Sequence, residues 1–128
     1  MKIVGIGVDI VDNKRFKNLV KDKKFINRTF SKNEISNSKK ISNKINFYSK
    51  RFAAKESFAK ALGTGFRNGL NFKDVEILNN NLGKPYYLKN IKIKQFIKKI
   101  KKIDNFELFL SISDEKDYSV AFTIIQKV

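Results

Sequence analysis

The chain has 128 residues and a mass of 14.9 kDa, a length that predicts a single domain over residues 1–128. It contains no cysteine and no histidine, which excludes disulfides, thiolate metal sites and histidine general bases. No apolar run approaches the roughly 20 residues of a membrane span and no signal-peptide pattern opens the chain, so we expect a cytoplasmic protein without a membrane partner.

The chain is strongly basic, with 28 lysines and arginines against 12 aspartates and glutamates and a net charge of +16. Such a charge indicates an acidic partner, although an ordinary solvated lysine surface also explains part of it. Of these 28 residues, 24 are lysine and only 4 are arginine, whereas proteins that read nucleic acids depend strongly on arginine. A non-catalytic nucleic-acid-binding domain is therefore the alternative hypothesis to an enzyme, and no helix-turn-helix, zinc or RNA-binding sheet motif supports it.

The first third of the chain predicts one strand and two helices. Residues 2–11 are rich in isoleucine and valine without a helical period, which predicts a buried strand. Asp12 is a suitable N-cap for a helix over residues 13–22. After a basic connecting segment, Ser31 and Glu34 have the spacing of a capping box, which predicts the start of another short helix.

The strongest helix signal runs from Asn46 to Leu62, after a polar run over residues 36–44 that predicts a loop or a frayed helix end. Apolar side chains surround much of this helix, so we expect it to be central, and Gly63 is suited to end it. Four of the five alanines and three of the six glycines fall in or just after this helix, which indicates a local requirement for small side chains: Ala53, Ala54, Ala59, Ala61, Gly63, Gly65 and Gly69.

The second half of the chain consists mainly of predicted strands. Residues 75–78 and 85–88 flank a turn and predict an antiparallel pair. An amphipathic helix is expected from Asn90 to about Ile103, with its lysines facing outward. Residues 106–113 and 118–126 predict a final hairpin. The expected class is α+β, with a mainly antiparallel sheet packed on the central helix.

Asp9 is a carboxylate near the end of the otherwise apolar first strand. Burial of an unpaired carboxylate costs on the order of several kcal/mol, so Asp9 needs a cation or hydrogen-bond donors close by. A helix-cap or salt-bridge role explains it equally well at this point. Gly5 and Gly7, which precede it, do not form a dinucleotide-binding motif, because a third glycine and a directly following helix are missing.

Glu56 and Lys60 lie one turn apart on the same face of the predicted central helix. An ordinary surface ion pair is the simplest interpretation of this spacing. The helix is expected to be buried, however, and residues 63–65 supply backbone amides that a phosphate could approach. Together, Asp9 and Glu56 provide oxygen ligands suited to Mg²⁺, with Lys60 beside a phosphate. The pattern therefore indicates phosphoryl-type chemistry on a diphosphate substrate.

These residues occur in motifs that resemble those of holo-acyl-carrier-protein synthases, the small bacterial-type phosphopantetheinyl transferases. The strand motif is GIGVD at residues 5–9, with Arg15 six residues later. The helix motif is RFAAKESFAKALGTG at residues 51–65. Three further segments follow in the order of the family: FKDVEI at residues 72–77, GKPY at 83–86 and SIS at 111–113. The resemblance therefore covers nearly the whole chain.

The resemblance implies transfer of the 4′-phosphopantetheine arm of coenzyme A to a serine of apo acyl carrier protein, with release of adenosine 3′,5′-bisphosphate. It implies that Asp9 and Glu56 bind Mg²⁺. Lys60 is expected beside the reacting phosphate, where it assists deprotonation of the serine directly or through a water. The positions expected to contact coenzyme A are Arg51, Lys60, Gly63, Thr64, Gly65, Lys84, Pro85 and Ser113.

The resemblance also implies protein partners. Arg15 and Arg28 are expected to dock an acidic helix of the carrier protein, with Phe16 and Phe25 as apolar anchors, although ordinary surface charge also explains the arginines. Small members of the family are usually homotrimers with active sites between subunits. Asp114 replaces a histidine that the family usually has near the nucleotide end of coenzyme A. Because a carboxylate repels phosphate, either a lysine such as Lys116 compensates or coenzyme A binds more weakly.

Overall fold

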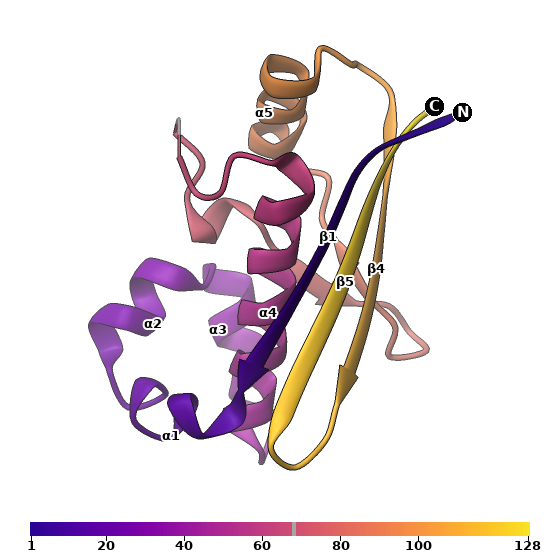
Figure 1. The fold of residues 1–128 in the computed structure, drawn as a ribbon. Coiled ribbons are helices and arrows are strands. Elements are labelled where there is room, and N and C mark those ends of the chain that lie inside the picture. Colours follow the sequence, from indigo (N-terminus) through magenta and orange to yellow (C-terminus); the bar gives the residue numbers. More distant parts are fainter. Residues whose placement is uncertain (68) are drawn as a thin grey trace.

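The computed structural model describes residues 1–67 and 69–128, and its central feature is one long helix packed against a sheet (Figure 1). Helix α4 (Lys44–Leu62) lies across one face of three antiparallel strands in the order β1 (Lys2–Asp12), β5 (Tyr118–Lys127) and β4 (Phe106–Asp114). A second antiparallel pair is formed by β2 (Ile77–Asn79) and β3 (Pro85–Tyr87). The predicted α+β class, the central helix and both hairpins are confirmed.

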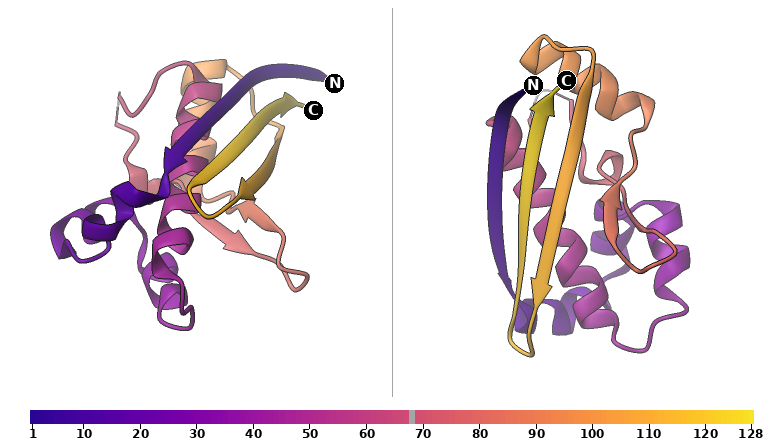
Figure 2. Two further views of the ribbon diagram at one scale, coloured as in Figure 1. Left: turned by 60° about the horizontal axis from the view of Figure 1, so that its bottom comes forward. Right: turned by 90° about the vertical axis from the view of Figure 1, so that its right-hand side faces the viewer.

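Short helices cover the two ends of α4, as the views in Figures 1 and 2 agree. Near its N-terminus lie α1 (Phe16–Leu19), α2 (Lys23–Thr29) and α3 (Lys32–Ser38), and near its C-terminus lies α5 (Ile91–Lys101). Two 3₁₀ turns complete the chain, η1 (Asn13–Arg15) and η2 (Phe72–Asp74). None of the helices within residues 1–67 and 69–128 combines the length and hydropathy that a membrane span requires.

The prediction of one helix over residues 13–22, followed by a connecting segment, was wrong. Asp12 does cap η1, accepting a hydrogen bond from the Lys14 amide, but α1 ends at Leu19. Asp22 is extended, with φ −88° and ψ 97°, and its side chain accepts from the Phe25 amide. Asp22 therefore starts a new helix, α2, where the sequence indicated only a connection. The capping box at Ser31 and Glu34 is confirmed as the start of α3.

The small residues allow α4 to pack closely on β1. A β carbon at Gly7 would lie only 2.6 Å from the amide nitrogen of Ala61, and one at Gly5 would collide with the Ala61 carbonyl. Ala53, Ala54, Ala59 and Ala61 are all buried in α4. The predicted requirement for small side chains is therefore a packing requirement between a helix and a strand.

Strand β1 is buried on one face only, whereas the sequence predicted a buried strand. Alternation places Gly5, Gly7 and Val11 towards α4, whereas Ile6, Val8 and Ile10 point away from it and are between 53 and 61% exposed. Apolar residues of the neighbouring strands, Phe122 and Phe109, are also exposed. The sheet therefore presents an open apolar face opposite α4.

A buried ion pair joins α3, α4 and the segment before β2. Lys55 and Glu34 are both inaccessible to solvent, and their Nζ and Oε1 atoms lie 2.8 Å apart. Lys55 also donates to the carbonyls of Phe72 and Val75, while Glu34 accepts from the amides of Ser31 and Ile77. Burial lowers the pKa of Lys55, and Glu34 partly offsets this shift. Every polar group of the pair is thus bonded, which fixes how these three segments pack.

Candidate active site

Asp9 and Lys60 meet where β1 crosses α4. Asp9 lies on the face of β1 that packs against the helix, and Lys60 is on the last turn of α4. The Nζ of Lys60 donates to Oδ1 of Asp9 at 3.0 Å. The Lys60 side chain is 57% exposed and that of Asp9 only 16% exposed, so the carboxylate is at the base of the pair and the ammonium reaches towards solvent.

Glu56 lies one helical turn before Lys60 and is half-buried. Burial raises its pKa, the negative charge of Asp9 raises it further, and the positive charges of Lys60 and Arg15 act in the opposite direction. Asp9, Glu56 and Lys60 are therefore close enough to influence one another electrostatically, and we call them the carboxylate cluster. Packing of β1 on α4 brings together the three residues that the sequence singled out.

The carboxylate cluster fits a hard divalent cation. Burial is the main cause of the raised pKa of Glu56, and repulsion by the Asp9 carboxylate adds to it. A shared cation would offset both effects. Mg²⁺ typically takes one or two protein carboxylates and fills its remaining positions with water and substrate phosphate oxygens. In the part of the chain that the structure describes, no group of three or more carboxylates gathers as a more complete site. The donor set is thus incomplete without a substrate.

The amides of Gly63 and Gly65, expected beside a phosphate, bond within the chain instead. The amides of Gly63 and Gly65 donate to the Ala59 carbonyl, and Gly63 also donates to Lys60, so both amides cap the end of α4. Gly63 and Gly65 have φ values of +81° and +65°, which favour glycine. The C-terminal end of a helix is also its negative end. Any attraction for phosphate here therefore comes from Lys60 and not from these two amides.

Arg51 is on another side of α4, away from the carboxylate cluster. Five helical residues separate it from Glu56, a rotation of about 140° around the axis. Its guanidinium carbon lies 3.6 Å from the Phe47 ring centroid, and Arg51 donates to Asn79 Oδ1 and to the Phe47 carbonyl. Arg51 is only 6% exposed, and burial lowers its pKa to about 10, with Glu34 acting against this shift.

This arginine lines a cavity of about 540 Å³, which we call the Arg51 cavity. Its cationic lining residues are Arg51, Lys40 and Lys50, and its carboxylate is Asp114. A small adjoining cavity shares Arg51, Lys50 and Asp114 and is also lined by Pro85. Of the other positions expected to contact coenzyme A, Lys84 is exposed and does not line either cavity, and Ser113 is exposed on β4 facing away from α4.

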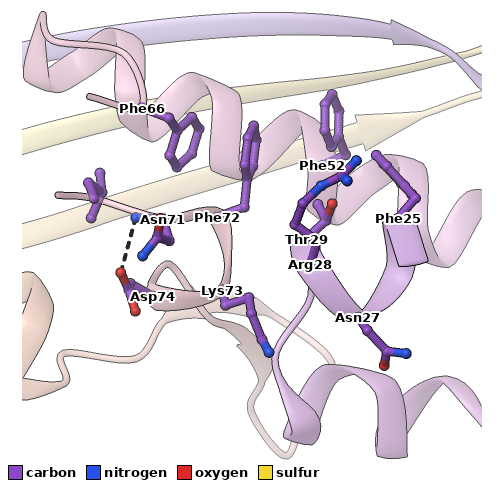
Figure 3. A pocket seen from close by; sticks show the side chains of 11 residues that line it. Phe25, Asn27, Arg28, Thr29, Phe52, Phe66, Asn71, Phe72, Lys73 and Asp74 are labelled. Carbon is purple, nitrogen blue, oxygen red and sulfur yellow. Dashed lines mark hydrogen bonds between the residues drawn. The ribbon is translucent and has the colours of Figure 1, made fainter. Parts of the chain in front are cut away.

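The expected partner-binding residues lie beside a second cavity, of about 610 Å³ (Figure 3). Half-buried rings of Phe25, Phe52, Phe66 and Phe72 line it, and Figure 3 shows them in a row from Phe66 to Phe25, with Arg28 beside Phe52. The Phe66 and Phe72 ring centroids are 3.7 Å apart, and those of Phe72 and Phe52 are 5.5 Å apart. We call this cavity the aromatic groove.

Phe16 is not an exposed anchor, because it is fully buried beneath the aromatic groove. Its ring packs against Phe25 and Phe52, with centroid distances of 5.9 and 5.5 Å, and it therefore supports the groove from within. Arg15 and Arg28 are exposed, as expected, and the Arg15 guanidinium lies 5.9 Å from the Phe52 ring centroid. The groove thus adjoins the carboxylate cluster, since Phe52 precedes Glu56 by one turn of α4.

Sequence reasoning missed Phe52, Phe66 and Phe72 as groove residues and Lys50 and Asn79 as neighbours of Arg51. The helical spacing of Phe52, Glu56 and Lys60 was a usable signal, because residues four apart share a helix face. For Asn79 there was no signal, since its contact with Arg51 joins positions 28 residues apart.

Comparison with known proteins gives matches over nearly the full chain. Residues 5–123 match the 4′-phosphopantetheinyl transferase superfamily. A holo-[acyl-carrier-protein] synthase of Pelagibacter ubique is 60% identical over 127 residues, which are 99% of each chain.

Solved structures agree with this match. The crystal structure of holo-[acyl-carrier-protein] synthase from Neisseria meningitidis has a TM-score of 0.87 and 36% identity, covering 98% of this chain and 99% of that one. The synthase from Bacillus anthracis, solved in complex with CoA (3′,5′-ADP), has a TM-score of 0.82 and 32% identity, covering 100% of both chains. The resemblance inferred from the motifs is therefore confirmed.

Proposed function

Because this chain belongs to the 4′-phosphopantetheinyl transferase superfamily, among the holo-[acyl-carrier-protein] synthases that transfer phosphopantetheine from coenzyme A, we propose that the transfer takes place at the carboxylate cluster. The observation that carries this proposal is the meeting of Asp9, Glu56 and Lys60 at one crossing of β1 and α4. It joins an ammonium and two carboxylates, which are the groups needed to bind a charged diphosphate together with a divalent cation.

In the proposed reaction, the hydroxyl oxygen of a carrier-protein serine attacks the phosphorus that bears the pantetheine arm. A new phosphorus–oxygen bond forms, the bond to the nucleotide phosphate breaks, and adenosine 3′,5′-bisphosphate leaves with the bridging oxygen. The serine proton is released.

Each residue of the carboxylate cluster has a separate task in this reaction. Asp9 and Glu56 would hold Mg²⁺, which when bound neutralises charge on the diphosphate. The Lys60 ammonium is oriented by Asp9 and more than half exposed, so it can donate a hydrogen bond to a phosphate oxygen. Asp9 thereby fixes the position of Lys60 before the substrate binds, which reduces the cost of ordering it.

We propose that the nucleotide end of coenzyme A binds at the Arg51 cavity. Arg51 is a buried cation that lines this cavity together with Lys40 and Lys50, and these positive charges are complementary to an anion. Within one chain, however, Arg51 and Lys60 are about 13 Å apart along α4 and face different sides of it. A substrate that contacts both the Arg51 cavity and the carboxylate cluster is more readily held between two copies of the chain than around one helix.

We further propose that the active protein is a homotrimer. The open face of the sheet exposes Ile6, Val8, Ile10, Phe109 and Phe122, and a contiguous apolar surface of this kind is usually covered by another protein surface. Light scattering after size exclusion should give three times the chain mass. Val8→Lys, which introduces a charge into this face, should lower the mass to that of one chain, whereas Lys94→Glu on exposed α5 should not change it.

The carrier protein is proposed to dock at the aromatic groove. Arg15 and Arg28 are exposed beside half-buried Phe25 and Phe52, which combines positive charge with apolar surface. An acidic amphipathic helix is complementary to such a surface, and long-range attraction would speed its association. The groove is one turn of α4 from Glu56, so docking there places a carrier serine near the carboxylate cluster.

The transfer itself is tested with purified protein, coenzyme A, Mg²⁺ and an apo carrier protein. Mass spectrometry should show that the carrier gains one phosphopantetheine group and that adenosine 3′,5′-bisphosphate appears in equal amount. A folded enzyme that produces neither product would contradict the proposal. Binding of nucleic acid that is strongly salt-dependent and insensitive to Glu56→Gln would instead favour the alternative of a nucleic-acid-binding domain.

A further inference from the structure

The Arg51 cavity contains a carboxylate among its cations. Asp114 is at the end of β4 and lines the cavity with Arg51, Lys40 and Lys50. Its Oδ2 accepts a 3.1 Å hydrogen bond from Nδ2 of Asn46, which lines the same cavity. Asp114 forms no ion pair with Lys116 in the part of the chain that the structure describes. The carboxylate is thus held at the cavity, and the lysines that share this cavity are Lys40 and Lys50.

A second observation indicates that the cavity takes an anionic ligand. Arg51 is only 6% exposed, and its Nε has no hydrogen-bond partner among the described residues. Nε is itself inaccessible to a ligand, so an anion would be attracted by the positive charge that Arg51, Lys40 and Lys50 bring to the cavity. The cavity therefore combines attraction for one anion at Arg51 with repulsion of a second at Asp114.

With the nucleotide end bound in this cavity as proposed, Asp114 would have opposite effects on two forms of its ribose. A phosphate on the ribose carries negative charge and is repelled by the carboxylate. A free hydroxyl at the same position can donate a hydrogen bond to it. A carboxylate in this cavity therefore weakens the enzyme's preference for a phosphopantetheine donor with a phosphate on its ribose over a donor with a free hydroxyl there.

We propose that Asp114 is a specificity-determining residue that lets the enzyme use 3′-dephospho-coenzyme A with an efficiency close to that of coenzyme A. This inference rests on the proposed function, in which the nucleotide end binds at the Arg51 cavity. With the dephosphorylated donor, the serine oxygen forms the same bond to phosphorus. The bridging bond breaks as before, the serine proton is released, and the leaving group is adenosine 5′-monophosphate.

The test compares kcat/KM for the two donors in the wild type, in Asp114→Asn and in Asp117→Asn. The control removes the same charge three residues away, at an exposed position that does not line the cavity. Asp114→Asn should raise the preference for coenzyme A about three- to tenfold, the effect of one unit charge near a phosphate in a partly exposed site. Asp117→Asn should change that preference by less than about twofold, because Asp117 does not line the cavity and its charge is screened by solvent and salt.

Equal donor preferences in wild type and Asp114→Asn would overturn the inference, as would a wild type that uses only coenzyme A. Calorimetric titration with adenosine 3′,5′-bisphosphate and adenosine 5′-monophosphate provides a readout that does not require turnover. There, Asp114→Asn should strengthen binding of the bisphosphate relative to the monophosphate, and Asp114→Ser repeats the measurement should the first variant fold poorly. Absence of transfer from both donors, with this binding shift intact, would contradict the proposed function but not the role of Asp114.

Discussion

The Lys60 ammonium on α4 donates a 3.0 Å hydrogen bond to Oδ1 of Asp9 on β1, joining side chains 51 positions apart in the sequence. This contact exists because Gly7, two residues before Asp9, has no β carbon to separate the strand from the helix. The close approach of β1 to α4 therefore determines where the carboxylate cluster forms. Both activity and stability depend on it.

For activity, we expect Asp9→Asn and Glu56→Gln each to lower kcat by about a hundredfold or more, the scale of losing a major electrostatic contact to a reacting group. Both substitutions keep the shape of the side chain and remove its charge. The measurement is the rate of holo-carrier formation at several Mg²⁺ concentrations. Asp104→Asn, in an exposed ion pair with Lys98, serves as the control and should retain the wild-type rate. Unchanged rates in both cluster variants would refute the assignment of the metal ligands.

The raised pKa of Glu56 predicts a pH-dependent stability in metal-free buffer. Because the folded state favours the protonated carboxyl, its stabilising contribution is complete below the ordinary pKa of 4.5 and is lost as the pH rises through the raised value. Relative to Glu56→Gln, the wild type should therefore become less stable over this range. Urea unfolding with chelator measures the difference, and Mg²⁺ should restore stability to the wild type alone. A pH-independent difference would count against the raised pKa of Glu56, and so against its burial beside Asp9.

Gly7→Ala should destabilise the fold by about 1–3 kcal/mol or more, because its β carbon would overlap the backbone of α4 at Ser57 and Ala61. Urea unfolding monitored by circular dichroism gives this free energy of unfolding. Gly83→Asn is the control: open space surrounds the missing β carbon of Gly83, which, unlike Gly7, has a positive φ. Asparagine tolerates that backbone conformation, so the control should cost less than about 1 kcal/mol.

Lys55→Met should lower the free energy of unfolding by about 3–5 kcal/mol, since it leaves the Glu34 carboxylate buried without its ion-pair partner. The double variant Lys55→Met/Glu34→Gln removes both charges and should recover a substantial part of that loss. A double-mutant cycle by urea unfolding measures the coupling. Additive effects of the two substitutions would show that the pair does not act as a unit.

Arg28→Glu should raise the KM for the carrier protein several-fold and leave the KM for coenzyme A nearly unchanged, because Arg28 lines the aromatic groove and not the Arg51 cavity. The wild-type KM for the carrier should rise with salt, and this dependence should weaken in the variant. Lys98→Glu makes the same charge reversal on α5 and should have little effect. Equal effects of Arg28→Glu and Lys98→Glu on the KM for the carrier would indicate that carrier binding depends only on the net charge of the enzyme.

The local features of this chain were readable from the sequence because they depend on neighbouring residues. The capping box at Ser31, the end of α4 at Gly63 and both hairpins follow from side chain to backbone bonding or from short-range periodicity. The division of residues 13–29 into two helices was missed, because Asp22 can either continue a helix or cap the next one, and local sequence does not decide between them.

Motif spacing also identified Asp9, Glu56 and Lys60, but only the tertiary structure brought β1 onto α4 and formed the cluster. The same holds for the aromatic groove and for the contact between Arg51 and Asn79, which join segments far apart in the chain. Phe16 was expected at the surface and is buried, since exposure depends on how α1 and α2 pack. Residue type and spacing determine what chemistry is available, whereas packing determines which side chains meet and which of them a substrate can reach.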